Sequence, residues 1–306
     1  MYLACGSSAW GMGHLRRSGE VIRVLRRNGL NLDSVAWLPE QGTFKEDPLF
    51  LSNFNKRVSA LGELYPGKYN GLIVDVHTAA QVTVNKWVAG TGVPIAALDW
   101  YSERPEKMIC ALNLRDNSEG LKYAIVREEF HSAAEGGKHF GYDIVAVLGG
   151  GDQRGAGPRL LESFQSDSRF LKRTIAIICG PLTKWTIPGG VRGRIKVLTN
   201  PPDICNLMAG ARVGISNAGT SLMEFSFLGV PTVVFPQTIE EDSFARLFIE
   251  NGSSVSGNWE GNRWMDELDH LLSDEILREI RSKKARLLVD GKGVDRIVES
   301  IMSAMC

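Results

Sequence analysis

The chain has 306 residues, of which 43% are hydrophobic and 23% charged, which excludes wholesale disorder and is long for a single hydrophobic core. Lys plus Arg and Asp plus Glu both number 35, and this formal net charge of zero gives no reason to expect nucleic acid as a partner. The five cysteines form no CxxC pair, which argues against a disulfide framework and favours a reducing, cytoplasmic location. No apolar stretch reaches the roughly 18 residues of a membrane helix, so no transmembrane segment or signal peptide is expected.

The first part of the chain repeats a short apolar run, a turn and an amphipathic stretch. Short apolar runs predict strands over residues 2–5, 35–38, 72–74, 95–98 and 123–126. Helical periodicity predicts helices over residues 16–28, which Gly29 ends as a C-cap, and 79–89. Runs that are continuously apolar are typical of parallel strands buried on both faces of a sheet.

A second series of the same kind starts near residue 142. Strands are predicted over residues 144–148, 174–178, 195–198, 213–215 and 231–235. Helices are predicted over residues 159–164, 203–209, 220–228, 264–272, 274–287 and 294–302. We therefore expect an α/β protein with two Rossmann-like domains, residues 1–138 and 139–306, facing across a cleft and joined at the glycine-rich stretch 135–138.

The first candidate site is the run Gly11-Met12-Gly13-His14-Leu15-Arg16-Arg17, which follows a predicted strand. Ligands of open α/β sheets bind at the carboxyl ends of strands, where a glycine such as Gly13 lets the backbone approach closely. His14 could accept a proton near neutral pH, or it could simply cap the helix or pack on the turn. Arg16 stands where the dinucleotide fingerprint GxGxxG requires its third glycine, so no dinucleotide is predicted.

The second candidate is the run Ser216-Asn217-Ala218-Gly219-Thr220-Ser221-Leu222-Met223-Glu224, which joins a strand to a helix. Free amides at Gly219, Thr220 and Ser221 would point at a phosphate. The Glu224 carboxylate can accept two hydrogen bonds from a ribose diol. The alternative is a capping box, with Thr220 or Ser221 as the N-cap and Glu224 reaching back.

Three further features stand at predicted strand ends. The run Gly149-Gly150-Gly151-Asp152 allows a tight approach to a ligand or to the opposite domain, or is an ordinary loop. Asp75 and Asp99 put carboxylates on the carboxyl rim of the first sheet, as structural caps or as functional groups. The absence of HExxH, paired cysteines and DxD predicts neither a metal nor a cofactor.

Taken in order, these residues resemble the UDP-sugar hydrolase of the pseudaminic acid pathway and the related spore-coat polysaccharide proteins. The run that contains His14 resembles the GxGHxxR motif of that family, and Asp75 follows a strand as in its "VD" motif. Asp99 resembles the family's Asp-rich turn, and Asn113 resembles its later Asn. Three later stretches also resemble motifs of that family. Residues 123–130 resemble "YALLRxEF", and residues 149–152 resemble "GGSD". Residues 216–224 together with 228–231 resemble "GxGGSTxWE…LGxP". The chain departs from the pattern at Met223, where Trp is frequent, and in having fewer glycines in the third stretch.

The resembled family is similar to GT-B glycosyltransferases such as the muramyl-peptide glycosyltransferase of peptidoglycan synthesis. The resemblance implies a nucleotide on the C-terminal domain, with Glu224 at the ribose and the Gly219–Ser221 turn at the diphosphate. It also implies that His14 is the base that activates water at the anomeric carbon, and we place Asp75 and Asp99 with it as catalytic candidates. The predicted nucleotide and diphosphate contacts are Gly13, Arg17, Gly150, Gly151, Asn217, Gly219, Thr220, Ser221 and Glu224.

The expected function is a metal-independent nucleotide-sugar hydrolase that converts a UDP-sugar and water to UDP and free sugar. The first alternative is a GT-B glycosyltransferase that passes the sugar to an acceptor in polysaccharide biosynthesis. The arginines of the helix at 16–28, including Arg16, Arg17, Arg23, Arg26 and Arg27, could form its membrane-docking patch. The second alternative is a non-catalytic protein that binds a nucleotide-sugar.

Overall fold

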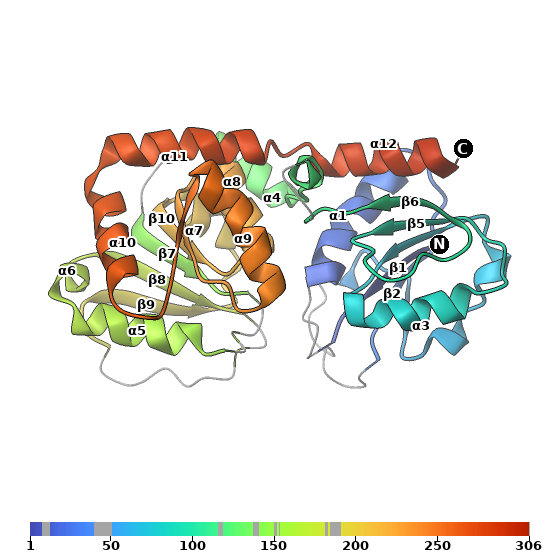
Figure 1. The fold of residues 1–306 in the computed structure, drawn as a ribbon, viewed down its shortest axis with the longest axis horizontal. Helices are drawn as coiled ribbons and strands as arrows, with labels where there is room; N and C mark the ends of the chain where they lie inside the picture. Colours follow the sequence, from blue (N-terminus) through green and yellow to red (C-terminus); the bar gives the residue numbers. More distant parts are fainter. Residues whose placement is uncertain are drawn as a thin grey trace. The chain divides into compact units, whose positions relative to one another are not determined.

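The computed structural model describes residues 1–7, 13–39, 51–115, 119–136, 141–149, 152, 154–180, 183 and 191–305. Four residues of the predicted loops lie outside the described residues: Gly11, Met12, Gly150 and Gly151. The chain forms two compact units, one of Met1–Ile125 with Lys292–Cys306 and the other of Val126–Gly291 (Figure 1). This division corrects the predicted boundary between residues 138 and 139.

The first unit, unit 1, contains a six-stranded sheet and three α-helices among its described residues. Its strands are β1 (Tyr2–Cys5), β2 (Ser34–Trp37), β3 (Lys56–Val58), β4 (Leu72–Asp75), β5 (Ile95–Leu98) and β6 (Met108–Leu112). Its α-helices are α1 (Gly13–Arg27), α3 (Thr78–Val88) and α12 (Gly293–Met305). Three short 3₁₀ helices are η1 (Leu61–Glu63), η2 (Pro66–Lys68) and η3 (Gly120–Tyr123).

The second unit, unit 2, contains another six-stranded sheet. Its strands are β7 (Tyr142–Val147), β8 (Thr174–Cys179), β9 (Arg194–Thr199), β10 (Ala211–Ser216), β11 (Thr232–Val234) and β12 (Ser254–Ser256). Its described helices are α4 (Glu128–Glu135), α5 (Ala156–Ser166), α6 (Ser168–Leu171), α7 (Ile204–Ala209), α8 (Thr220–Leu228), α9 (Ile239–Asn251), α10 (Arg263–Ser273) and α11 (Glu275–Leu288).

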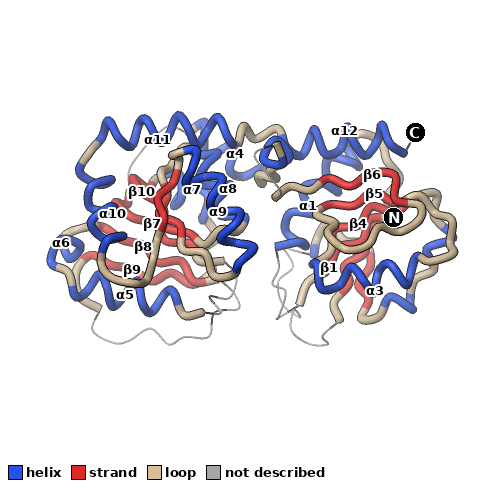
Figure 2. The backbone as a smooth tube through the Cα atoms, in the orientation of Figure 1, coloured by secondary structure: helices blue, strands red, loops and turns tan. Residues whose placement is uncertain are grey.

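Both sheets have the same strand order, and all strand pairs are parallel. In each unit the strands lie side by side with helices around them (Figure 2). The orders β3-β2-β1-β4-β5-β6 and β12-β11-β10-β7-β8-β9 are each the doubly wound Rossmann order. The strand order reverses between β1 and β4 in unit 1 and between β7 and β10 in unit 2. Ligands bind at such switch points beside the carboxyl ends of the strands. The prediction of two Rossmann-like domains is therefore confirmed.

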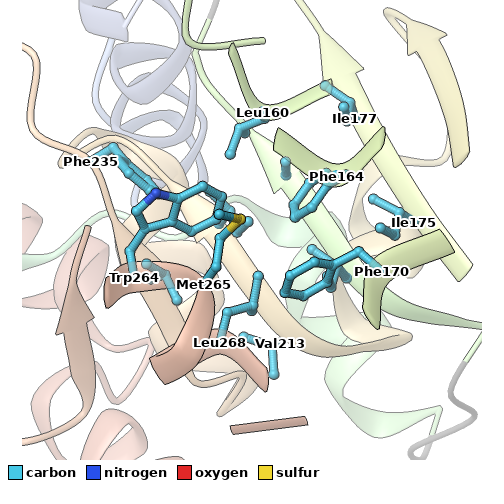
Figure 3. Packing of buried hydrophobic residues seen from close by; sticks show 14 of the residues in the cluster. Leu160, Phe164, Phe170, Ile175, Ile177, Val213, Phe235, Trp264, Met265 and Leu268 are labelled. Carbon is cyan, nitrogen blue, oxygen red and sulfur yellow. The ribbon is translucent and has the colours of Figure 1, made fainter. Parts of the chain in front are cut away.

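The core of unit 2 lies between one face of its sheet and helices α5, α6 and α10. Aromatic side chains fill it, with the rings of Phe164 and Phe170 5.3 Å apart and the ring of Phe235 5.1 Å from Trp264 (Figure 3). On the other face, α8 packs closely, because a Cβ at Gly214 of β10 would meet the Phe225 ring at 3.0 Å. This close contact holds the start of α8 beside the end of β10.

In unit 1, helix α3 covers one face of the sheet, and α1 and α12 lie side by side on the other face (Figure 1). Helix α12 buries Val294, Ile297, Val298 and Ile301. At its first residue, a Cβ on Gly293 would overlap the backbone of Tyr123 and Ala124. The amphipathic pattern predicts that α12 needs a sheet to cover, but it does not show which sheet, so the sequence prediction placed this helix in the second domain, whereas it belongs to unit 1.

Several elements differ from the sequence prediction. Residues 123–126 are a buried apolar run, but they form no strand, because the chain passes from unit 1 to unit 2 there. The strands β3, β6 and β12 were not predicted, since they are sheet edges whose side chains are partly polar or exposed. Helix α9 escaped prediction because its first turn carries Glu240, Glu241 and Asp242.

None of the helices in the described ranges is both long and apolar enough to cross a membrane.

Candidate functional site

Helix α1 brings three polar side chains to the switch point of unit 1. His14, Arg17 and Ser18 are spaced by three and four residues, so they share one face of the helix. Asp75 is the last residue of β4, and its side chain points to the α1 face of the sheet, where these three residues meet it. The structure therefore joins two predicted catalytic residues, His14 and Asp75, that are 61 positions apart in the chain.

The Asp75 carboxylate accepts hydrogen bonds from three side chains and is fully buried. His14 Nδ1 lies 2.7 Å from Oδ1, Arg17 Nε donates to Oδ2 at 2.9 Å and Nη2 to Oδ1 at 2.5 Å, and Ser18 Oγ donates to Oδ2 at 2.8 Å. Burial alone would raise the pKa of Asp75, but the charge of Arg17 and the hydrogen bonds lower it well below its usual range. The group is therefore a carboxylate at any physiological pH.

Arg17 is the centre of this cluster, because it also binds the second predicted carboxylate. Its Nη1 donates to Asp99 Oδ2 at 2.6 Å, and its side chain is only 3% exposed. Burial lowers the pKa of Arg17, but the two carboxylates raise it by more. The predicted contact between Arg17 and the nucleotide is thus not what the structure shows: both ends of the guanidinium face protein carboxylates.

Asp99 is held by backbone as well as by side chains. It has a left-handed backbone with φ of +52°, and its Oδ1 accepts from the amide of Leu114 at 2.7 Å and from the hydroxyl of Tyr101 at 3.2 Å. Gln81, which the sequence analysis missed, donates from Nε2 to the Asp99 carbonyl oxygen at 2.6 Å. Burial raises the pKa of Asp99, and Arg17 and Arg115 lower it by more. An unusual backbone that is bonded on every side is typical of a functional site.

These contacts determine the state of the His14 ring. His14 Nδ1 lies 2.7 Å from Asp75 Oδ1, which only accepts hydrogen bonds, and 3.1 Å from Arg17 Nη2, which only donates them. The shorter contact favours a ring proton on Nδ1, since Arg17 Nη2 donates to Asp75 Oδ1 at 2.5 Å instead, and this tautomer has its lone pair on Nε2. Burial lowers the pKa of His14 below its ordinary 6.5, the charge of Arg17 lowers it further, and Asp75 only partly opposes them. A neutral, oriented imidazole whose side chain is 17% exposed is what a general base requires.

Gly13, the first residue of α1, has open space where a Cβ would lie. The arginines of α1 do not form a continuous basic surface. Arg26 donates to the Asn53 carbonyl oxygen and to Ser34 Oγ, and Arg23 pairs with Glu20. With Arg17 buried as well, the docking patch that the alternative function invoked on this helix is not supported.

The switch point of unit 2 carries the second predicted run. Helix α8 starts at Thr220 after Gly219, whose extended backbone is the N-cap without any side-chain cap. The capping-box alternative is therefore wrong, and Glu224 lies too far into the helix to serve it. The first amides of the helix, at Thr220 and Ser221, have no helical acceptors and can face an anion.

Two side chains shape the loop before α8. Asn217 donates from Nδ2 to Glu241 Oε1 at 2.8 Å, and Glu241 Oε2 accepts from the amide of Gln237 at 2.6 Å. Gly149 has φ of +81°, and a Cβ there would meet Asn217 Nδ2 at 3.6 Å. The loops that follow β7 and β10 are thus close together around Asn217. The sequence prediction did not include Glu241, because this residue stands in a run of acidic residues with Glu240 and Asp242.

Glu224 is almost completely buried, and its partner is Arg127. Arg127 Nε donates to Glu224 Oε1 at 2.7 Å, and Nη1 donates to Glu129 at 2.7 Å. The guanidinium also lies 4.7 Å from the ring centre of Phe130. The segment 127–130, which carried part of the family resemblance, therefore orients the carboxylate predicted for the ribose.

Asp152 is a helix cap in the structure. Its carboxylate accepts from the amides of Ala156 and Gly157, both at 2.8 Å, and its backbone is left-handed with φ of +43°. Burial raises its pKa, and the two amides only partly compensate.

Across the described part of the chain, no three His, Cys, Asp or Glu side chains gather so as to hold a metal ion.

Comparison with known proteins gives one curated relative and many structural neighbours. No protein-family model matches the chain. The spore coat polysaccharide biosynthesis protein SpsG of Bacillus subtilis (strain 168) is 27% identical over 192 residues, 58% of this chain. The chain spans about half (56%) of that relative's length. This match agrees with the resemblance to spore-coat polysaccharide proteins.

Two solved structures illustrate the similarity of fold. MurG of Acinetobacter baumannii matches with a TM-score of 0.63 and 13% identity over 99% of both chains. UGT2 of Phytolacca americana, complexed with UDP-2-fluoroglucose and pterostilbene, matches with a TM-score of 0.65 and 13% identity over 99% of this chain and 98% of the other. The chain has the GT-B fold.

Replacing Asp75 by Asn tests the buried cluster. The change leaves the positive charge of Arg17 with one carboxylate instead of two, so we expect a loss of about 3–5 kcal/mol in the free energy of unfolding of unit 1. Ser18→Ala is the matched control, because it removes one neutral hydrogen bond from the same carboxylate and should cost about 1 kcal/mol. Urea unfolding followed by hydrogen exchange of peptides from β1 and α1 measures both. Equal losses for the two variants would contradict the account.

Proposed function

We propose that this chain is a nucleotide-sugar enzyme that transfers the sugar of a UDP-sugar to a hydroxyl group of an acceptor in polysaccharide biosynthesis. The observation that carries the proposal is the neutral His14 imidazole, whose Nδ1 is bonded to Asp75 and whose Nε2 can accept a proton. A hydroxyl group is a weak nucleophile until such a base takes its proton.

The chemistry needs few groups. The acceptor oxygen attacks the anomeric carbon, its proton passes to His14 Nε2, and the bond between the anomeric carbon and the diphosphate oxygen breaks. The electron pair of that bond leaves with UDP, a stable anion that needs no acid. Asp75 and Arg17 do not touch the substrate in this proposal; they are positioning residues, of which Asp75 orients the imidazole and Arg17 helps to keep it neutral.

The nucleotide is assigned to unit 2. The free amides at the start of α8 suit a diphosphate, and their helix contributes a partial positive charge there. Glu224 suits the ribose diol, since Arg127 fixes its orientation. Gly219, Thr220, Ser221 and Asn217 stay proposed contacts of the diphosphate loop. The sugar nucleotide in the UGT2 structure and the name of SpsG support a UDP-sugar substrate and a role in polysaccharide synthesis.

Hydrolysis is the second candidate, favoured by the stretches that resemble the UDP-sugar hydrolase. The same base would then activate water, and the products would be UDP and free sugar. Among the fold neighbours are glycosyltransferases such as SnogD of Streptomyces nogalater, and this favours transfer over hydrolysis. The two reactions differ only in the attacking oxygen, so one assay separates them.

The experiment follows UDP release from a panel of UDP-sugars, with and without added polyols and glycans. His14→Gln cannot accept a proton, so the rate should fall by about 10²–10⁴-fold while UDP binding is unchanged. Because only the neutral ring is active, the wild-type rate should fall with decreasing pH along a limb centred below pH 6.5. Release that requires an acceptor supports transfer, and release in water alone supports hydrolysis. Binding of UDP without any release of UDP from the sugar nucleotides would contradict both transfer and hydrolysis.

The role of Glu224 is tested by comparing UDP with 2′-deoxy-UDP. Glu224→Ala should weaken the binding of UDP about tenfold more than that of 2′-deoxy-UDP, because it removes a charged acceptor of the 2′-hydroxyl. Glu129→Ala is the control, since it takes the other, more exposed carboxylate from Arg127. It should affect both nucleotides alike. A titration in which Glu224→Ala weakens both equally would rule out the ribose contact.

A further inference from the structure

Helix α11 carries exposed apolar side chains along one line of its surface. Ile276, Ile280 and Leu287 are 72%, 49% and 84% exposed. Single exposed apolar residues are ordinary, but these three follow a regular spacing together with Lys283. Residues 276, 280, 283 and 287 are separated by four, three and four positions, which is the spacing with which one helix packs along another. We call these four residues the α11 seam.

The opposite face of α11 is committed to unit 2. Ser282 and Ala285 are buried, and the helix packs on α8, α9 and α10. A Cβ at Gly229, which ends α8, would meet Ser282 Oγ at 2.6 Å, and Arg281 donates to the Gly252 carbonyl oxygen at 2.9 Å. These contacts fix the rotation of α11, which runs along one side of unit 2 with its seam turned outward (Figure 1).

The exposed charges of α11 are separated along the helix. Glu275 and Glu279 are exposed in its first half, and Lys283 and Lys284 are exposed in its second half. A second copy of α11 laid antiparallel brings each acidic half beside a basic half, whereas a parallel copy would bring like charges together. The acidic first half also makes α11 a poor match for an anionic lipid surface.

The apolar residues of the seam are self-complementary in the same arrangement. A two-fold axis that passes between residues 281 and 282 places Ile276 level with Leu287 of the second copy. It also places Ile280 level with Lys283 of the second copy, whose ammonium group can reach Glu279 beside it. A two-fold interface requires such a surface, because the same patch is used on both copies.

We propose that the α11 seam is the docking surface for a second copy of this chain, which packs antiparallel along it about a two-fold axis. One pair of helices buries less than the roughly 1,200–2,000 Å² of stable, specific interfaces. The association is therefore reversible, with a Kd on the order of 10–100 µM. The proposal is independent of the proposed function, since it concerns a helix that carries none of the proposed site residues.

The apolar part of the contact is tested by Leu287→Glu, which places a charge at each end of the two-fold seam. We expect this change to raise the Kd for self-association at least about tenfold. Its melting temperature should stay that of the wild type, because the side chain is exposed. Ile239→Glu is the matched control, since Ile239 is 83% exposed on α9, outside the seam, and its replacement should leave the Kd unchanged.

The charge pattern is tested by reversal and rescue. Glu279→Lys brings like charges together in the antiparallel pair and should raise the Kd about tenfold. Adding Lys283→Glu to that variant restores opposite charges between the copies and should restore the wild-type Kd. Circular dichroism of each variant checks that α11 itself is kept, because the two residues are also an i,i+4 pair within the helix.

The measurement is sedimentation equilibrium of the full-length chain from about 5 to 500 µM, a range that brackets the expected Kd. The expected result is a monomer–dimer equilibrium in the wild type and in Ile239→Glu, a shift to monomer in the two single seam variants, and recovery in the double variant. A wild type that stays monomeric throughout, or a dimer that Leu287→Glu leaves intact, would overturn the proposal. A double variant that stays monomeric would overturn the antiparallel arrangement. Flotation of a monomeric wild type with phosphatidylserine vesicles would show instead that the seam binds lipid.

Discussion

The site of unit 1 depends on one buried interaction, in which the Arg17 guanidinium lies between the carboxylates of Asp75 and Asp99. Burying three charges costs free energy that their mutual attraction only partly returns, so such clusters contribute little net stability. Buried charges of this kind are more common where function needs them. Here burial and Arg17 lower the pKa of His14, and the hydrogen bond with Asp75 fixes which ring nitrogen is the base.

The cluster also explains how the fold of unit 1 serves its chemistry. Arg17 comes from α1, Asp75 from the end of β4 and Asp99 from the residue after β5, so one side chain joins three successive parts of the sheet edge. Unit 2 has the same strand order but different groups at its switch point, which offers backbone amides at the start of α8 and the ion pair between Arg127 and Glu224. In the proposed function, one topology thus supplies an anion-binding helix start in one unit and an oriented base in the other.

Much of this could be predicted from sequence, because buried parallel strands and glycine-rich turns leave strong local patterns. The same patterns located His14 at a helix start, Asp75 at a strand end and Glu224 within the helix that follows a strand. The partners of these residues could not be predicted, since Arg17 meets Asp99 only through the order of strands in the sheet. Edge strands such as β3 and the docking of α12 also escaped, because partly polar edges and amphipathic helices do not specify their neighbours. The N-cap position at Gly219 excludes the capping box for Glu224, and the carboxylate binds Arg127 instead.

The central claim is that His14 is a neutral base whose pKa is lowered by burial and by Arg17, and whose ring proton is held on Nδ1 by Asp75. It is tested most directly by nuclear magnetic resonance. The full chain labelled with nitrogen-15 histidine gives the shifts of both ring nitrogens, and His14→Gln assigns them. We predict a protonated Nδ1 and a bare Nε2 at pH 7, with a titration midpoint below 6.5. A proton on Nε2, or a midpoint above 6.5, would contradict the account.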